Sequence, residues 1–127
     1  MESTLKAIIE QKLNAITDAI QIIQERTKQF NNVNEMLTDF YGTMVFDSCV
    51  MRLQTIGENI KSIDDRTEGS LLDKYPNIPW KQIIGLRNII SHEYANIDPD
   101  VIWSIIAKHL APLAKEIDII KNDLAAQ

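Results

Sequence analysis

Residues 83–94 read I-I-G-L-R-N-I-I-S-H-E-Y, a stretch in which apolar and chemically active side chains are closely interleaved. Five large aliphatic residues surround Arg87, Asn88 and His92, and Tyr94 closes the stretch. Charged and proton-transferring groups usually lie on solvent faces, away from apolar clusters. A helix of this composition would hold its polar groups in fixed positions, which is what a functional site requires.

Outside this stretch, apolar residues also recur at three- and four-residue intervals, the period of amphipathic helices. Only four Gly and four Pro occur in 127 residues, too few for the many tight turns of an all-β fold. We therefore predict an all-α protein, an antiparallel four-helix bundle in a single domain over residues 1–127. The predicted helices start at Ser3 or Thr4 and fade near 26–32, then cover about 35–63, 79–93 and 99–124, with a loop over 64–79 that includes a short helical turn near 70–75.

Three local signals refine these helices. Gly57 interrupts the second helix, where glycine costs roughly 1 kcal/mol relative to alanine, so we expect another helix to approach closely there. Asp98 before Pro99 is a strong start signal for the last helix. Pro112 lies inside that helix and should bend it, because proline removes one backbone hydrogen bond.

Composition limits the possible functions. The formal net charge is −5, so the overall field opposes capture of a polyanion, and any contact with RNA must be local or shared with a partner. The single cysteine, Cys49, excludes an internal disulfide, and we expect it to be a buried, inert thiol. No zinc-binding spacing, signal peptide or membrane span is recognisable, which indicates a cytoplasmic protein.

The spacing of the polar groups raises a geometric problem. On an ideal helix Tyr94 lies about 20° from Arg87, so the two share a face, whereas His92 lies about 140° away from Arg87. One straight helix therefore does not aim both side chains at a single atom. Either the helix loosens before His92, or a second copy completes the site across a twofold axis.

An arginine and a histidine together suit the cleavage of a phosphodiester bond. A histidine with an ordinary pKa near 6.5 can accept and return a proton at neutral pH. A guanidinium can bind two phosphate oxygens and offset the charge that develops on them. In RNA the ribose 2′-hydroxyl is the nucleophile, so the reaction requires neither a metal nor a protein nucleophile, and we expect no cofactor. Asn88 and Tyr94 could hold the phosphate or orient the imidazole.

Structural roles explain the same residues, and the spacing alone favours them over catalysis. His92 suits the negative end of a helix dipole, Arg87 could pair with Glu58 or Glu93, and Tyr94 could close the core. The second histidine, His109, is predicted to be an ordinary surface residue.

A longer pattern adds to this interpretation. The segment G-L-R-N-I-I-S-H-E-Y closely resembles the signature of HEPN-domain proteins, in particular the HepT-like branch that is paired with minimal nucleotidyltransferases. The resemblance extends from about residue 39 to 113. It includes M-R-L-Q-T-I-G-E-N-I-K at 51–61, Y-P-N-I-P-W-K-Q-I-I-G-L-R at 75–87 and I-D-P-D-V-I-W-S-I-I at 97–106.

This resemblance implies a homodimer whose Arg–His motifs face each other in a cleft, and a metal-independent endoribonuclease that acts as a toxin. Arg87 and His92 would be catalytic and Asn88 would assist them. Tyr94 would receive AMP from the partner nucleotidyltransferase, the antitoxin, and the added bulk and negative charge beside Arg87 would silence the toxin. Ser91 departs from the apolar residue expected before the histidine.

Two other functions are consistent with the sequence. The chain could be a non-catalytic helical module that binds a partner nucleotidyltransferase or presents substrate to it. It could also be a plain structural dimer, in which Arg87 and His92 affect stability alone.

Overall fold

The computed structural model describes the backbone of all 127 residues and the side chains of all but Ser91, Glu93 and Tyr94. The elements that it contains are helical, in agreement with the predicted all-α class. They are α1 (Ser3–Thr27), α2 (Val33–Met36), α3 (Phe40–Arg66), η1 (Leu72–Lys74), α4 (Trp80–Glu93), η2 (Tyr94–Asn96), α5 (Pro99–Ser104), η3 (Ile105–His109) and α6 (Leu110–Ala125).

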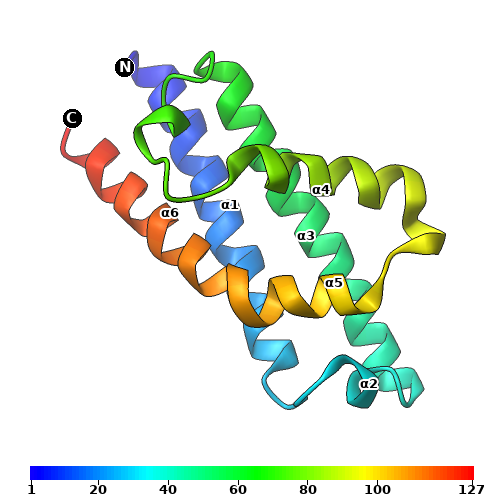
Figure 1. Cartoon of the computed structure of the whole chain (residues 1–127). Coiled ribbons are helices and arrows are strands. Elements are labelled where there is room, and N and C mark those ends of the chain that lie inside the picture. Colours follow the sequence, from blue (N-terminus) through cyan, green and yellow to red (C-terminus); the bar gives the residue numbers. More distant parts are fainter.

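The long helices form a bundle, as predicted. Helices α1 and α3 lie side by side and run antiparallel, and α6 packs along α1 (Figure 1). Helix α4 lies across α3, and its C-terminal end projects to the right-hand side of Figure 1 before the chain turns back into α5. The site residues predicted from the sequence are therefore carried by a helix whose main packing partner is α3.

The apolar stripes of α1, α3 and α6 meet in one core. Complete burial of an aliphatic side chain contributes about 1.5–3 kcal/mol, so these stripes are the main source of stability. No helix in the described part of the chain combines the length and hydropathy needed to cross a bilayer. The largest fully buried side chains are Ile9, Leu13, Ile16, Ile20, Ile23, Met36, Ile56, Ile60, Ile63, Ile102, Leu110 and Ile117.

The first helix begins where it was predicted, but its cap is different. The carboxylate of Glu2 accepts hydrogen bonds from the backbone N–H groups of Thr4 and Leu5, at 2.8 and 3.0 Å. Glu2 is therefore the N-cap, in place of the predicted Ser3 or Thr4. Its longer side chain reaches the first free N–H groups, and its charge suits the positive end of the helix dipole.

The predicted start of the second helix was wrong, because the non-helical residues 37–39 separate α2 from α3. The carboxylate of Asp39 accepts a hydrogen bond from the backbone N–H of Gly42 at 2.8 Å and so caps a new helix. A Cβ at Gly42 would lie only 1.7 Å from the carbonyl oxygen of Met36. Glycine thus allows α3 to begin against the end of α2, which a helical period alone does not reveal.

Helix α3 also runs three residues beyond its predicted end, to Arg66. The turn after it contains Glu68 and Gly69, which have positive φ values of 52° and 78°, and the backbone N–H of Gly69 donates to the carbonyl of Asp64 at 2.9 Å. This bond closes the helix end as in a Schellman motif. The short helical turn predicted near 70–75 is confirmed as η1.

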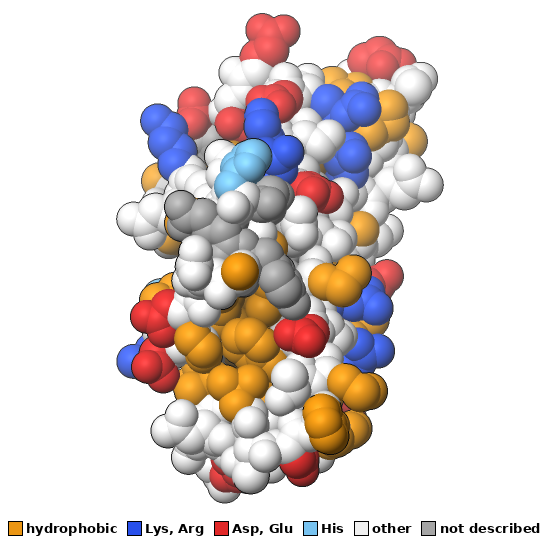
Figure 2. All heavy atoms as spheres, turned by 90° about the vertical axis from the view of Figure 1, so that its right-hand side faces the viewer, with side chains coloured by type: hydrophobic (Ala, Val, Ile, Leu, Met, Phe, Trp, Pro, Cys, Tyr) orange, Lys and Arg blue, Asp and Glu red, His pale blue; other side chains and the backbone are white. Residues whose placement is uncertain are grey.

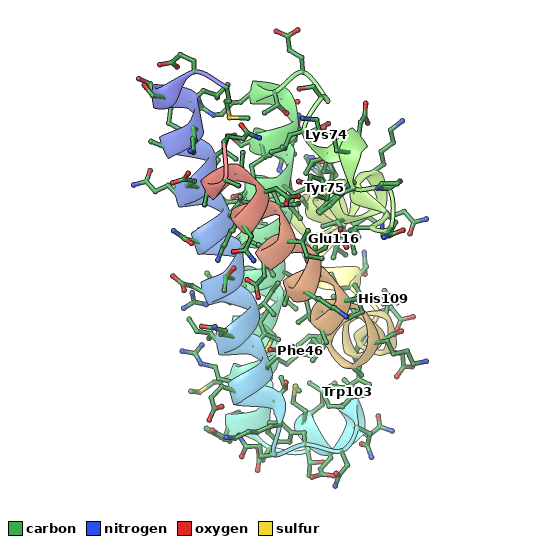
Figure 3. All side chains as sticks on the ribbon, turned by 90° about the vertical axis from the view of Figure 1, so that its left-hand side faces the viewer. Phe46, Lys74, Tyr75, Trp103, His109 and Glu116 are labelled. Carbon is green, nitrogen blue, oxygen red and sulfur yellow. The ribbon has the colours of Figure 1, made fainter. Side chains whose placement is uncertain are left out.

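The loop before α4 is fixed by two hydrogen bonds around Tyr75. The Trp80 indole donates to the carbonyl of Tyr75 at 2.8 Å, and the Tyr75 hydroxyl donates to the Asp123 carboxylate at 2.6 Å. Figure 3 shows Tyr75 beside α6, near Glu116. Partial burial and then the Asp123 carboxylate raise the pKa of Tyr75 to about 12, so the donor keeps its proton. The N-terminal end of α4 is thereby attached to α6.

The predicted bend at Pro112 is confirmed, with a π-helical turn just before it. In η3 the backbone N–H of Leu110 donates to the carbonyl of Ile105, five residues earlier. Pro112 is the third residue of α6 and has no N–H to donate. The wider turn accommodates this loss, and α5 and α6 leave it in different directions (Figure 1).

The buried cysteine leads to a prediction about pH. Burial raises the pKa of the Cys49 thiol from 9.0 to about 11, and the nearby Arg26 opposes this increase. The unfolded chain therefore releases the thiol proton first, and the stability that Cys49 contributes is lost as the pH rises through this window. The free energy of unfolding of wild type relative to Cys49→Ala should fall by on the order of 2 kcal/mol between about pH 8 and 11. A constant difference, or alkylation of native Cys49 at neutral pH, would contradict this assignment.

Candidate functional site

Helix α4 carries the predicted site, and it is regular through its whole length. The carbonyl of Pro79 accepts hydrogen bonds from the N–H groups of Gln82 and Ile83, at 3.0 and 3.2 Å, so proline precedes the helix instead of occupying its first turn. The α-helix then continues to Glu93. It does not loosen before His92, so the angle of about 140° between Arg87 and His92 persists within one copy.

The packing of α4 across α3 fixes the position of Arg87. Gly57, predicted to mark a close helix approach, faces the backbone of α4 at Ile83 and Arg87. This prediction is confirmed. Arg87 is partly buried at the crossing, and its Nη1 donates a hydrogen bond to Oδ1 of Asn88 at 2.8 Å. The Asn88 amide thus restricts the guanidinium, and its predicted assisting role in catalysis stays a prediction.

A shallow pocket of about 370 Å³ opens beside Arg87. It brings together three cationic side chains and two carboxylates, so a locally positive site exists on an acidic protein. Its lining consists of Glu58, Lys61, Ser62, Asp65 and Arg66 from α3 together with Arg87 from α4.

Internal contacts already organise the α3 side of this pocket. Lys61 forms an ion pair with Asp65 at 2.8 Å, and Nε of Arg66 donates to the Ser62 hydroxyl at 3.2 Å. The predicted pairing of Arg87 with Glu58 is absent among the ion pairs of the described side chains, and Glu58 instead accepts a hydrogen bond from Gln54 at 3.4 Å. Glu58 therefore borders the pocket without forming an ion pair with Arg87.

His92 is exposed in the last turn of α4. This position suits both a cation at a helix C-terminus and a group that meets a substrate. The predictions for the side chains of Glu93 and Tyr94, and the departure at Ser91, lie outside the described side chains. The other histidine, His109, is exposed as predicted and lies on the face drawn in Figure 3.

The face that contains the C-terminal end of α4 is drawn in Figure 2. It shows a histidine with Lys and Arg side chains beside it, and hydrophobic side chains gathered below them. Basic groups for an anion and an apolar surface therefore occur on one side of the molecule. Among the described side chains, no three His, Cys, Asp or Glu lie close enough to hold a metal ion together.

Lys61, Ser62 and Arg66 were not among the site residues predicted from the sequence. Their spacing contained a usable signal, because positions three, four and eight residues after Glu58 share one face of a helix. That face could be assigned to the site only once α4 was known to cross α3 near Gly57.

Known proteins that are similar to this chain carry names of ribonucleases or belong to a ribonuclease family. Residues 10–120 match the family model described as "Ribonuclease HepT-like". A Methanocaldococcus jannaschii protein whose name marks it as an inferred RNase is 30% identical over 116 residues, which cover 91% of this chain and 95% of that protein. The "mRNA nuclease HepT" of Shewanella oneidensis is 25% identical over 124 residues, covering 95% of this chain and 93% of that protein. The "Probable ribonuclease HepT" of Thermococcus cleftensis is 26% identical over 111 residues, covering 87% and 93%. None of the solved structures gives a significant match.

Proposed function

Because this chain belongs to the HepT-like ribonuclease family, we propose that it is a metal-independent endoribonuclease and the toxin of a toxin–antitoxin pair. The observation that carries the proposal is the accessible Arg–His pair on one uninterrupted helix, with Arg87 at a cationic pocket and His92 exposed. The proposed substrate is RNA, since its 2′-hydroxyl supplies the nucleophile that this site lacks.

The proposed reaction follows from the chemistry of the two groups. The ribose 2′-oxygen attacks the adjacent phosphorus, an imidazole of His92 accepts the 2′-hydroxyl proton, and the 5′-oxygen of the next nucleotide leaves with a proton. The products are a 2′,3′-cyclic phosphate and a 5′-hydroxyl. Arg87, restrained by Asn88, offsets the negative charge that grows on the phosphate oxygens.

A second copy of the chain would complete this site. Within one protomer, Arg87 and His92 leave α4 about 140° apart, so they do not converge on one phosphate. A twofold axis that brings two α4 helices together would place Arg87 of one protomer near His92 of its partner. We propose this homodimer as the active form.

An exposed stripe of α3 supports a dimer on this side of the molecule. Positions 40, 44 and 51 fall within an arc of about 40° on the helix, and Glu58 at the pocket lies on the same line. The stripe thus runs about 17 Å along α3, and Glu58 at the pocket beside Arg87 lies about 10 Å further along the same line. Exposed apolar side chains that gather on one face of a helix are typical of an interface. The stripe consists of Phe40, Met44 and Met51, which are 91%, 66% and 66% exposed.

The nuclease proposal is tested with purified protein on RNA in the presence of EDTA. Because His92 is the proposed acid–base group, His92→Ala should cut roughly 10²- to 10⁴-fold more slowly than wild type. Its free energy of unfolding should change by less than about 0.5 kcal/mol, since the side chain is exposed.

The second exposed histidine provides a matched control, and His109→Ala should cut RNA at the wild-type rate. Product ends should carry the 2′,3′-cyclic phosphate, and an all-DNA copy of the substrate should stay intact. Equal cleavage by wild type and His92→Ala, or none by either, would refute the proposed nuclease.

The dimer is tested by placing charges on the α3 stripe. Like charges facing each other across the twofold axis should separate the protomers of Met44→Glu/Met51→Glu. Light scattering after gel filtration should show the dimer mass for wild type and the monomer mass for the variant, which should also lose RNA cleavage. Ile119→Glu, at a 41% exposed position on α6, should remain dimeric. A monomeric wild type, or a dimeric double variant, would contradict the proposed interface.

We further propose that a partner nucleotidyltransferase silences the toxin by transferring AMP to the hydroxyl of Tyr94. The backbone of Tyr94 begins η2, directly after the helix that carries Arg87 and His92. An adenylyl group there would add bulk and negative charge next to a cationic site.

Co-expression with the adjacent gene should suppress growth arrest, and the Tyr94 peptide should gain the mass of one adenylyl group. The Tyr94→Phe toxin should escape both effects. Exposed Tyr41 serves as the control, since Tyr41→Phe should still be modified and silenced. Modification at Tyr41, or silencing of Tyr94→Phe by modification elsewhere, would exclude Tyr94 as the target.

A further inference from the structure

At the crossing of α3 and α4, Gly57 lies directly against the segment of α4 that carries Arg87. A Cβ built on Gly57 would lie 2.8 Å from Cβ of Arg87 and 3.2 Å from the carbonyl oxygen of Ile83. Both atoms are held rigidly by α4, because the Ile83 oxygen is part of the backbone and Cβ of Arg87 is bonded directly to it. Neither can turn away as the end of a flexible side chain would.

Gly57 therefore determines how closely α4 approaches α3 at Arg87. With glycine, the Cα–Cβ bond of Arg87 sits directly against the backbone of α3, and the guanidinium extends beside the pocket lined by Glu58 and Lys61. With any larger residue, the segment of α4 that carries Arg87 would have to move outward. The other glycine of this region, Gly85 on α4, has nothing within 4 Å of its added Cβ.

We propose that Gly57 is a positioning residue for Arg87, acting through the distance between α3 and α4. The kinetic part of this inference rests on the proposed nuclease. A displacement of about 1 Å at a reacting group can lower the rate about 10²-fold. The geometric part, that Gly57 sets the location of Arg87, stands on the helix crossing itself.

The kinetic test compares Gly57→Ala with Gly85→Ala, two identical substitutions in helix interiors. Gly57→Ala should lower kcat for RNA cleavage at least tenfold and leave KM within about twofold, because Arg87 acts on the transition state. Gly85→Ala should retain the wild-type kcat and should have a higher melting temperature than wild type, since alanine favours helix.

A double-mutant cycle separates positioning from general packing. If Gly57 acts through Arg87, Gly57→Ala should have less than a twofold effect on kcat when Arg87 is already alanine. The same tenfold loss in both backgrounds would overturn the assignment, because it would show an effect independent of the guanidinium. If Gly57→Ala does not fold by circular dichroism, the more stable Gly57→Ala/Gly85→Ala variant replaces it.

A direct readout of Arg87 keeps the inference testable without enzymatic activity. In protein labelled with ¹⁵N-arginine, the Nε–Hε resonance of Arg87 is identified by its loss in Arg87→Ala. It should shift clearly in Gly57→Ala and much less in Gly85→Ala. An unmoved resonance would overturn the positioning role. A shifted resonance in a protein that cuts no RNA would support the positioning role and refute the proposed nuclease.

Discussion

The close packing of α4 across α3 is the contact on which the candidate site depends. Helix α4 is a short helix whose polar residues gain a defined position only from its neighbours. Gly57 removes the side chain that would separate the two backbones, and Arg87 is consequently held at the edge of α3. The pocket residues Lys61 and Arg66 belong to α3, so the same contact also assembles the cationic surface beside Arg87.

This arrangement would reconcile an acidic protein with the proposed RNA substrate. A net charge of −5 weakens long-range attraction of RNA, but specific binding depends on charges within a few ångströms of the phosphate. The pocket provides such charges where α3 and α4 cross. The remaining acidic groups would oppose non-specific binding elsewhere on the surface, so RNA binding would concentrate at the proposed site.

The two ends of α4 differ, because its first turn is held by hydrogen bonds and its last turn is exposed. Its beginning is fixed to the bundle, because the Trp80 indole binds the Tyr75 carbonyl and the Tyr75 hydroxyl binds Asp123 on α6. Its last turn carries His92 at the surface. A firmly attached helix with an exposed end leaves the imidazole of His92 accessible at little cost in stability, since the buried side of the helix does the packing.

The helical class and the number of long helices could be predicted from the sequence, because they follow from a period of apolar residues that is local in the chain. The helical segment that carries the candidate site residues was predicted in the same way. The start of α3 could not, since it depends on Asp39 as a cap and on the fit of Gly42 against the carbonyl of Met36, a contact of 1.7 Å for any added Cβ. The close approach of another helix at Gly57 was predicted from the sequence. Only the tertiary structure shows that Arg87 is the residue that Gly57 contacts. The same holds for Lys61, Ser62 and Arg66, which an amphipathic pattern marks only as solvent-facing residues.

Local periodicity thus determined which residues form helices and which faces are apolar. Only the packing of one helix across another decided which exposed charges of α3 lie next to Arg87, because that depends on distances between residues far apart in the chain.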